Sequence, residues 1–333
     1  MVDYGGTLLT SIILRAALTL TAAGMAVAQT IAGGPMAVNV TGRDATVVWL
    51  VEDRTVTLAS AKERRTSPAY RVEKTTFTGL QPGTRYEYNV NGLDSGKGSF
   101  QTALQGDGAF DFVVYGDTRT RHDVHARLIR QLLASGKADF VVNTGDQTEN
   151  ANDASLWPHF FESERELLRQ SAFYPSLGNH ERNSRNYYEF FQQAKPYYSF
   201  DWGSAHFSVI DSDLNNIGSN QVERRAFWDD QSRWLEEDLR IHQDSTFRFV
   251  VAHHPPMTAV ARRQGDNPHM SALMPMFEKF KVSAALFGHD HNYQHYLTNG
   301  IHYLVSGGGG APLYDVDKPA AGVQRVVSVE NFI

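Results

Sequence analysis

Short apolar runs alternate with longer amphipathic stretches from residue 110 to the end of the chain. The runs are four to eight residues long and are bounded by Gly, Asn or Asp, which is typical of fully buried strands. The predicted strands, each with its following loop, are 110–117, 139–146, 172–181, 206–213, 247–256, 282–291 and 301–310. Apolar residues at helical spacing predict helices at 122–135, 155–170, 221–243 and 271–280. This alternation predicts an α/β domain.

A different pattern precedes it, in which short segments of alternating apolar and polar residues are separated by turn residues. The predicted strands are 45–51, 55–60, 69–80, 85–92 and 98–103. Strands of this length and spacing predict a small all-β sandwich. No cluster of chemically reactive side chains occurs in this region, so we interpret the pair Arg64 and Arg65 as a solvated loop and not as a binding patch.

A polar, Gly-rich segment at 105–109 marks the boundary between the two patterns. The sequence therefore predicts a sandwich domain at 29–105 and an α/β domain at 106–333. Residues 325–333 begin like a strand, but no turn or return strand follows. A truncated C-terminus is one hypothesis for this ending.

Residues 1–28 are predicted to be a signal peptide. Arg15 precedes an apolar stretch, and Ala26-Val27-Ala28 matches the small-residue cleavage pattern. The mature chain would begin near Gln29 and be secreted or periplasmic, with no stable membrane insertion after cleavage. The alternative is an uncleaved membrane anchor, for which the apolar stretch is short.

Composition narrows the classes of partner and ligand. The chain has 333 residues, 41% of them hydrophobic, which suffices for one large core and a smaller one. A formal net charge of −6 offers no basic stripe for nucleic acid, although a small phosphorylated ligand is compatible with it. Cysteine is absent, so any metal must be held by oxygen and imidazole.

Metal-ligand residue types follow five of the predicted strands. They are Asp117, Asp146, Asn179, His180, His253, His254, His289 and His291. Because the ligand site of an open α/β sheet lies beyond the carboxyl ends of its strands, we interpret these residues as one site. Two histidines at positions i and i+2 can reach one centre only from a loop or a strand end. Such ligands suit Mn, Fe or Zn.

The ordered set D, GD, GNHE, H-x-P and GHxH resembles the calcineurin-like metallophosphoesterase superfamily. A Pro-Gly turn before Tyr86 resembles the tyrosine corner of fibronectin type III domains, and Trp49 resembles their buried tryptophan. With such a domain in front, residues 34–333 are most similar to the purple acid phosphatase-like branch. The resemblance implies two β-sheets flanked by helices and two metal ions. Asp146 would bridge the metals, Asp117 and His291 would bind the first, and Asn179, His253 and His289 would bind the second.

The activity implied by this resemblance is hydrolysis of phosphate monoesters, with a metal-bound hydroxide as nucleophile. His180 would be the general acid, or alternatively would only orient its neighbours. Arg119 would grip the substrate phosphate, and His254 would face the substrate or support the ligands. The alternatives are a phosphodiesterase or nucleotide hydrolase that uses the same centre, and a non-catalytic binding protein with a degenerate metal site.

Several positions depart from the family pattern. Many members have a histidine where this chain has Arg119, and the purple enzymes have a tyrosine where it has Glu149. Without a tyrosinate the protein is not expected to be purple. Glu149 is then a candidate ligand of the first metal, and Asn150 and His122 are weaker ones. With the tyrosinate missing, the metal could be Fe, Mn or Zn. Tyr293-Gln294-His295 stands where the purple enzymes have Tyr-Glu-Arg.

Two other features lie near these motifs. The Gly-rich segment 306–314 does not open a helix, so we expect a tight loop lining the pocket and not a phosphate cradle. Trp157, Tyr187, Tyr188 and Tyr293 are predicted to lie in loops, where they either shape a substrate pocket or pack ordinarily.

Overall fold

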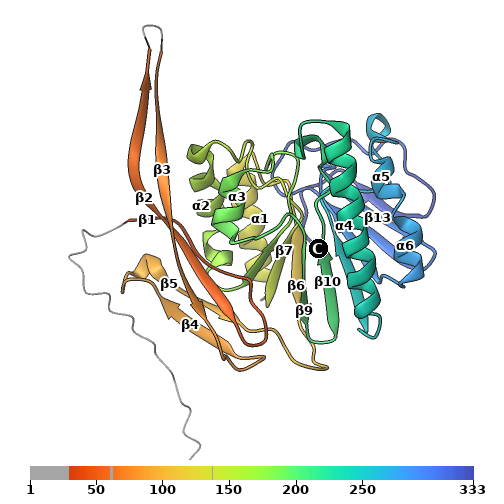
Figure 1. Ribbon diagram of the computed structural model, residues 1–333, viewed down its shortest axis with the longest axis horizontal. Helices are drawn as coiled ribbons and strands as arrows, with labels where there is room; N and C mark the ends of the chain where they lie inside the picture. Colours follow the sequence, from red (N-terminus) through yellow and green to blue (C-terminus); the bar gives the residue numbers. More distant parts are fainter. Residues whose placement is uncertain (1–29, 61–62, 137) are drawn as a thin grey trace, which may run out of the picture.

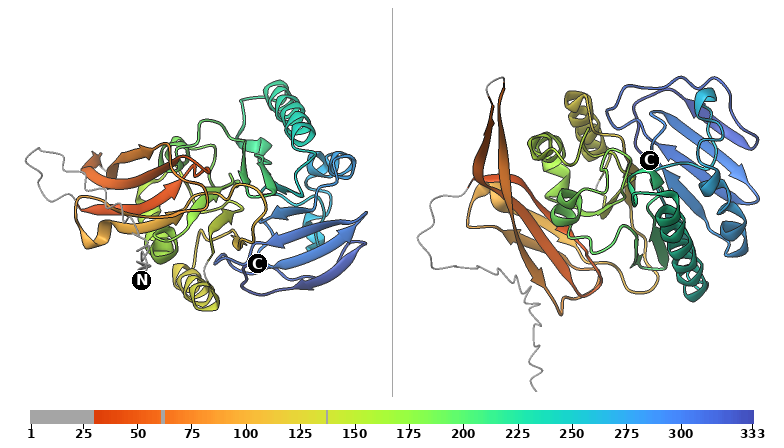
Figure 2. Two further views of the ribbon diagram at one scale, coloured as in Figure 1. Left: turned by 90° about the horizontal axis from the view of Figure 1, so that it is seen from below. Right: turned by 45° about the horizontal axis from the view of Figure 1, so that its top comes forward.

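The computed structural model describes residues 30–60, 63–136 and 138–333, so the predicted signal peptide lies outside the described residues. Within those ranges, none of the helices has the length and apolar character needed to cross a membrane. Two β-sheets pack face to face, with helices on their outer faces (Figures 1 and 2). This arrangement confirms the predicted α/β domain with two sheets flanked by helices.

The first sheet has the order β3-β2-β1-β8-β7-β6. Its last three strands are parallel and correspond to three of the predicted ones: β6 (Phe112–Tyr115), β7 (Phe140–Asn143) and β8 (Ala172–Pro175). Helices α1 (His122–Ser135), α2 (Trp157–Leu168) and α3 (Arg185–Phe191) cover its outer face. Leu132 of α1 and Phe161 of α2 share one apolar core with Val141 of β7.

The second sheet has the order β15-β13-β14-β12-β11-β10-β9. Its strands are β9 (Tyr198–Trp202), β10 (Ala205–Val209), β11 (Phe247–Val251), β12 (Ala284–Phe287), β13 (Tyr293–Thr298), β14 (Ile301–Ser306) and β15 (Val323–Val327). Strands β10, β11, β12 and β14 are parallel, and the others pair antiparallel. Helices α4 (Gln221–Ile241), α5 (Pro268–Ser271) and α6 (Met274–Lys279) cover this sheet.

Aromatic side chains fill the space between the two sheets. The ring of Phe140 on β7 lies 5.5 Å from that of Phe207 on β10, edge to face. Phe112 on β6 meets Phe249 on β11 in the same way, at 5.5 Å. These contacts hold the two sheets face to face.

The N-terminal region is all-β, as predicted, but its strands differ from the prediction. They are β1 (Ile31–Val38), β2 (Ala45–Ala59), β3 (Arg64–Phe77), β4 (Arg85–Asn89) and β5 (Lys97–Gln101). The predicted segments 45–51 and 55–60 form one strand, because an irregularity between Glu52 and Arg54 absorbs the turn-like residue Asp53. Arg64 belongs to β3, so the predicted loop at this position was wrong.

Strand β1 joins the N-terminal region to strands β6 to β8 in one sheet, which the sequence did not predict. It pairs with β2 on one side and with β8 on the other, where Ala37 lies opposite Ala172. The hydroxyl of Tyr174 donates to the carbonyl of Val40 at 2.6 Å and ties the same two regions together. One sheet therefore runs through both predicted domains, and β2 and β3 extend from it as a long ribbon (Figure 1).

Of the two fibronectin-like features, the tyrosine corner at Tyr86 is present and the fully buried tryptophan is not. The hydroxyl of Tyr86 accepts the backbone N–H of Gln81 at 2.9 Å, five residues upstream. Trp49 is half-buried at the edge of the inter-sheet core and is not fully enclosed. Four 3-10 turns complete the described structure: Asp94–Gly96, Ala154–Leu156, Leu214–Asn216 and Ala261–Arg263.

The segment 325–333 does not form one strand. It begins within β15, which pairs with β13, and then crosses to the other sheet. There the backbone N–H and C=O of Ile333 bond to the C=O and N–H of Val114 at 3.0 and 2.7 Å. The last residue thus lies beside β6, the strand that leads to Asp117.

Candidate metal centre

Six predicted ligand residues lie in loops that follow five parallel strands. Asp117 follows β6, Asp146 follows β7, Asn179 follows β8, His253 follows β11, and His289 and His291 follow β12. Parallel strands present their carboxyl ends at the same edge of a sheet. Because β6 to β8 and β11 to β12 belong to different sheets, the candidate site bridges both.

Three of these residues have a left-handed backbone. Their φ angles are 60° for Asp117, 58° for Asp146 and 67° for His289. Residues other than glycine adopt this region at a cost, which Asp, Asn and His bear best. Such strain concentrates at functional sites, where the surrounding structure holds it in place. We therefore infer that these three loops hold a strained backbone in order to position the side chains of Asp117, Asp146 and His289.

Glycines next to the ligand residues are required by close approach. A Cβ added to Gly178 would lie 2.2 Å from Asp146 Oδ1, and one added to Gly288 would lie 2.6 Å from Asp117 Oδ2. No real Cβ tolerates such distances. The glycine before Asn179 and the glycine before His289 thus leave room for the two carboxylates.

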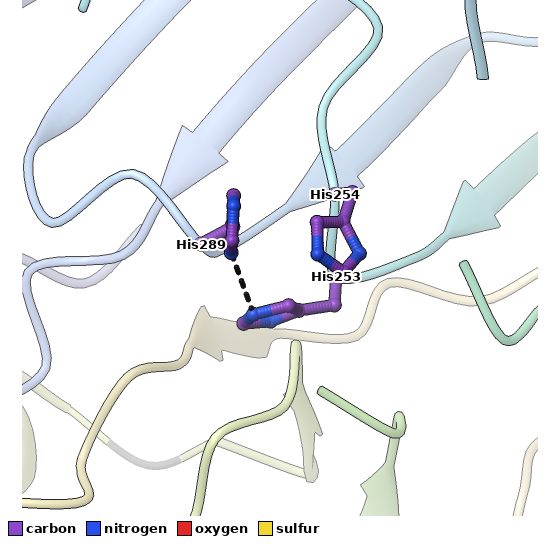
Figure 3. A group of neighbouring side chains, drawn as sticks. All are labelled: His253, His254 and His289. Carbon is purple, nitrogen blue, oxygen red and sulfur yellow. Dashed lines mark hydrogen bonds between the residues drawn. The ribbon is translucent and has the colours of Figure 1, made fainter. Parts of the chain in front are cut away.

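Asn179, His253 and His289 form the first group of converging atoms. Asn179 Oδ1 lies 3.2 Å from His253 Nε2 and 3.1 Å from His289 Nδ1, and the two nitrogens are 3.2 Å apart. Figure 3 shows the two imidazoles facing each other. His253 Nδ1 donates to the carbonyl of Thr144 at 2.8 Å, so in the neutral imidazole its Nε2 carries a lone pair. One proton on His289 can serve only one of the other two atoms, whereas a cation satisfies all three.

Asp117, Asp146 and His253 offer a second group, with ligand atoms within 4.8 Å of one another. Asp117 Oδ1 is buried and has no hydrogen-bond partner among the described residues. His291 Nε2 lies 3.4 Å from it, and its Nδ1 lies 2.7 Å from the carbonyl of Pro312, which orients the ring. Asp146 Oδ1 is 3.5 Å from His253 Nε2, so this carboxylate lies between the two groups. The donor set fits two hard or borderline cations.

His254 is also part of the first group, together with His253 and His289. Its ring centre is 4.1 Å from that of His289, and its Nδ1 bonds to the hydroxyl of Ser212 at 2.9 Å. Burial, together with the neighbouring His253, holds the pKa of His254 well below its ordinary value. His254 is therefore neutral, and its Nε2 has a lone pair in the tautomer that carries the proton on Nδ1.

His180, Arg119 and Glu149 lie beside Asp146. Arg119 Nη1 is paired with the Glu149 carboxylate, and its Nε is 3.6 Å from Asp146 Oδ2. Burial alone would lower the pKa of Arg119, but Asp146 and Glu149 outweigh it and raise the pKa. His180 Nε2 is 3.9 Å from Asp146 Oδ2, while its Nδ1 is 2.7 Å from the carbonyl of Glu149. The Glu149 side chain is 48% exposed and lies outside the two converging groups.

Glu181, within the GNHE motif, holds the ligand loops together, and sequence reasoning missed it. Its carboxylate is fully buried and accepts the backbone N–H groups of Asp146 and Gly178 at 2.7 Å and of Gln147 at 2.9 Å. Burial, and then the charge of Asp146, raises the pKa of Glu181 to about 8. The available signal was an acidic residue directly after His180, in a segment already singled out.

The glycine segment packs against the Asp117 loop, in agreement with the predicted tight loop. Gly309 N–H donates to Gly116 at 3.0 Å, and Ala311 N–H donates to the Asp117 carbonyl at 2.8 Å. The prediction of loop aromatic residues was wrong. Trp157 begins α2, within the helix predicted at 155–170. Tyr187 and Tyr188 lie in α3 and Tyr293 begins β13, two short elements that the sequence analysis did not identify. Trp157 and Tyr187 are buried in the core.

A third group of metal-ligand types, Asp201, His206 and His242, lies at the opposite end of the second sheet, where β10 begins. His206 is bonded to Asp201 at 2.7 Å and to Asp238 at 2.9 Å. The His206 and His242 rings are stacked, with centres 3.5 Å apart. Lone pairs lie in the ring planes, so stacked rings do not aim at one cation. We interpret this group as a buried ion-pair network.

Two facing sheets with Asp, Asn and His donors at their carboxyl ends define the metallophosphoesterase class of protein. The family model described as calcineurin-like phosphoesterase matches residues 110–293, and the chain belongs to this family.

Named relatives come from humans and plants. The chain is 23% identical over 252 residues to human acid phosphatase type 7. This alignment covers 67% of this chain and 56% of the human protein. It is 26% identical over 234 residues to purple acid phosphatase 7 of Arabidopsis thaliana, covering 61% of this chain and 71% of that protein. The chain thus spans little more than half the length of the human relative.

Solved structures agree on the fold. The purple acid phosphatase PPD1 of yellow lupin superposes with a TM-score of 0.66 at 17% identity, covering 90% of this chain and 68% of that chain. PhoD superposes with a TM-score of 0.60 at 13% identity, covering 86% and 79%. At these identities the likeness concerns the architecture.

Proposed function

We propose that this chain is a metal-dependent hydrolase of phosphate monoesters with a two-cation centre. The observation that carries the proposal is the convergence of three lone-pair atoms, from Asn179, His253 and His289, beside the unpartnered oxygen of Asp117. Asp117 and His291 would hold one cation, and Asn179, His253 and His289 the other. Asp146 would be shared. When bound, the cations supply positive charge that offsets the phosphate and lowers the pKa of water.

Arg119 is suited to bind the substrate phosphate. Its ion pair with Glu149 uses Nη1, and its Nε faces Asp146. A guanidinium has five N–H donors in a rigid fork, so Nη2 retains donors for phosphate oxygens. Glu149 would then hold the guanidinium in place and would not bind a metal. This assignment replaces the hypothesis that Glu149 substitutes for the missing tyrosine.

His180 is suited to protonate the departing alkoxide. Its Nδ1 lies 2.7 Å from the Glu149 carbonyl, which leaves Nε2 directed to the side of Asp146. Histidine is the side chain that most often transfers protons in enzymes. His254, neutral and bonded to Ser212, would support the second cation or accept a hydrogen bond from the substrate.

The experiment is hydrolysis of 4-nitrophenyl phosphate by protein loaded with Mn²⁺ or Zn²⁺. Asp146→Asn should remove nearly all activity and reduce the metal content measured by elemental analysis, because it removes the shared charge. Asp107→Asn, an exposed residue in the segment 105–109, is the matched control and should change neither. Full activity in Asp146→Asn, or activity that survives a chelator, would refute the proposal. Rates on bis(4-nitrophenyl) phosphate compare diesters in the same assay.

The predicted signal peptide belongs to the same proposal. A phosphatase of this kind would work outside the cytoplasm, as a secreted or periplasmic enzyme. With Glu149 in place of a tyrosine, the loaded protein should lack the visible band of tyrosinate bound to iron.

A further inference from the structure

Two polar side chains, His125 and Glu164, are buried in the apolar core of the first sheet. His125 belongs to α1 and is 1% exposed, and Glu164 belongs to α2 and is 0% exposed. They lie on the buried faces of these helices together with apolar residues such as Leu132 and Leu168. Burying such groups costs desolvation free energy, and apolar side chains of similar volume often stabilise a core as well or better. Stability alone therefore does not account for this pair.

The hydrogen bonds of the pair lead toward the candidate metal centre. His125 Nε2 lies 2.7 Å from Glu164 Oε1, and the hydroxyl of Tyr115 on β6 donates to Glu164 Oε2 at 2.6 Å. On the other side of the ring, His125 Nδ1 lies 2.6 Å from the backbone carbonyl of Gly309. A carbonyl oxygen can only accept, so Nδ1 carries a proton and donates it. The imidazole thus connects α1, α2 and β6 to the glycine segment.

The carbonyls of residues 309–312 are all in use. The first accepts from His125, as described. Arg121, the residue before α1, donates from Nε to the carbonyl of Gly310 at 2.7 Å and from Nη2 to the carbonyl of Ala311 at 2.6 Å. Three successive carbonyls are therefore held by side chains from the start of one helix.

The same segment contacts the two residues assigned to the first cation. The N–H of Ala311 donates to the carbonyl of Asp117 at 2.8 Å, where the backbone has its left-handed φ of 60°. The carbonyl of Pro312 accepts from His291 Nδ1 at 2.7 Å, which orients the ring so that Nε2 lies 3.4 Å from Asp117 Oδ1. Metal-binding histidines are commonly oriented through their other nitrogen in this way. A displacement of the segment would therefore move both residues.

We propose that His125 is a positioning residue for the first cation. It holds the segment 309–312 in place through the carbonyl of Gly309. That segment in turn aligns Asp117 and His291. The inference rests on the proposed function and deepens its account of the two-cation centre. The second cation takes none of its assigned donors from the residues bonded to this segment, so its affinity should change little.

Two substitutions separate the bond to Gly309 from the bond to Glu164. Asparagine places an amide where histidine has Nδ1, so His125→Asn retains a donor to the Gly309 carbonyl and loses the bond to Glu164. Glutamine places its amide near the position of Nε2, so His125→Gln retains the bond to Glu164 and loses the one to Gly309. Calorimetric titration of the full chain with Mn²⁺ should show two cations for the unmodified protein and for His125→Asn. In His125→Gln one cation should bind about ten-fold more weakly.

Double variants identify the cation that is affected. His291→Ala removes a donor to the first cation, so adding His125→Gln to it should weaken Mn²⁺ binding no further. His253→Ala removes a donor to the second cation. When His125→Gln is added to that variant, the remaining cation should bind about ten-fold more weakly. The reverse pattern would overturn the inference.

His206→Gln is the matched control. His206 is likewise buried and bonded through both ring nitrogens, to Asp201 and Asp238, but it lies at the opposite end of the second sheet. This variant should lower Tm and leave Mn²⁺ affinity unchanged. A loss of affinity that is the same in His125→Asn and His125→Gln, that occurs in neither, or that also occurs in His206→Gln would contradict a positioning role.

If neither His125 variant folds, hydrogen exchange of the unmodified chain decides. Because coupling is reciprocal, Mn²⁺ should slow exchange of the amides of Gly309 and Ala311, and unchanged exchange would overturn the inference. Metal binding, and not hydrolysis, is the readout, so the two proposals can fail separately. Two bound cations without hydrolysis would refute the proposed function and leave the role of His125 to be decided by the affinities. A chain that binds no cation would refute both.

Discussion

His180 is the residue whose proposed role leaves the clearest kinetic signature. If its imidazolium protonates the leaving group, a substrate that leaves readily needs it less than one that leaves poorly. His180→Asn should therefore reduce kcat for an alkyl phosphate by about 10²–10³-fold, and kcat for 4-nitrophenyl phosphate much less. Steady-state kinetics with both substrates at saturating metal provide the measurement.

The alternative role of His180, orienting its neighbours, makes a different prediction. Its backbone N–H donates to Asp146 Oδ1 at 3.0 Å, and this contact remains in the variant. A purely orienting side chain would affect both substrates by the same factor and would alter metal content. Equal losses would thus contradict a proton-transfer role.

Gly178 shows how a residue without a side chain can control the centre. Because an added Cβ would lie 2.2 Å from Asp146 Oδ1, Gly178→Ala should displace that carboxylate and lower activity by at least about 100-fold. The measurement is kcat with metal content determined in parallel. Gly42→Ala is the control, since its added Cβ would meet its nearest atom at an ordinary 3.4 Å. Normal activity in Gly178→Ala would show that the loop can accommodate the added Cβ without displacing the Asp146 carboxylate.

At the residue scale, the motifs identified the side chains that the structure brings together. Each of these side chains follows a strand whose end is marked in the sequence by a Gly, Asn or Asp. The contacts between loops could not be read in this way. Glu149 was a candidate ligand on sequence position alone, whereas the structure pairs it with Arg119 from another loop. Glu181 was missed for the same reason, since two of its three backbone donors, Asp146 and Gln147, are brought near it only by folding.

The long elements followed their patterns closely, and the short ones did not. The predicted helix 122–135 coincides with α1, since its apolar spacing extends over four turns. Helix α3 has seven residues and strands β9 and β13 have five and six. Such short segments carry too few periods to be distinguished from loops. Strand β2 was divided because Asp53 resembles a turn residue and in fact sits at a strand irregularity.

The ion-pair network of α4, β9 and β10 gives a prediction at this scale. Burial alone would lower the pKa of His206, but hydrogen bonds to Asp201 and Asp238 outweigh it and raise the pKa, while His206 in turn helps to lower the pKa of Asp238. The stability from the His206 charge is therefore present below its unfolded pKa, about 6.5, and is lost as the pH rises through the folded pKa. His206→Gln should cost about 2–3 kcal/mol at pH 5.5 and less at pH 9.

Thermal unfolding of the two proteins at both pH values tests this prediction. His302→Gln, an exposed histidine on β14, serves as the control and should show no such dependence. A penalty for His206→Gln that is constant, or that grows toward pH 9, would contradict a charged His206.

Metal binding should stabilise the molecule as a whole, since the donors come from both sheets. Cations that bind only the folded state at 100 times their Kd add about 2.7 kcal/mol. A chelator should therefore lower Tm by roughly 4 °C for each cation removed, and added Mn²⁺ or Zn²⁺ should restore it. Asp146→Asn should respond weakly to either treatment. A Tm that is independent of metal in the unmodified chain would argue against cations bridging the sheets.

The alternation of strands and helices predicted the α/β class, and the family resemblance implied the two facing sheets, but neither predicted the continuity of the first sheet. Strand β1 contains two glycines and a proline, so its pattern does not resemble a strand. Its pairing with β8 depends on an edge left open by another part of the chain. The domain boundary near residue 105 stays a prediction about sequence composition, because backbone pairing crosses it.

The junction at β1 is one of several contacts that join the N-terminal region to the α/β region. Besides the pairing of Ala37 with Ala172, the N–H of Ser99 donates to Arg169 at 2.6 Å, and the side chain of Asn39 donates to Gln192 at 2.9 Å. These hydrogen bonds support the pairing of β1 with β8. The N-terminal region is therefore fastened to the α/β region at three points, two of which are at the ends of α2 and α3.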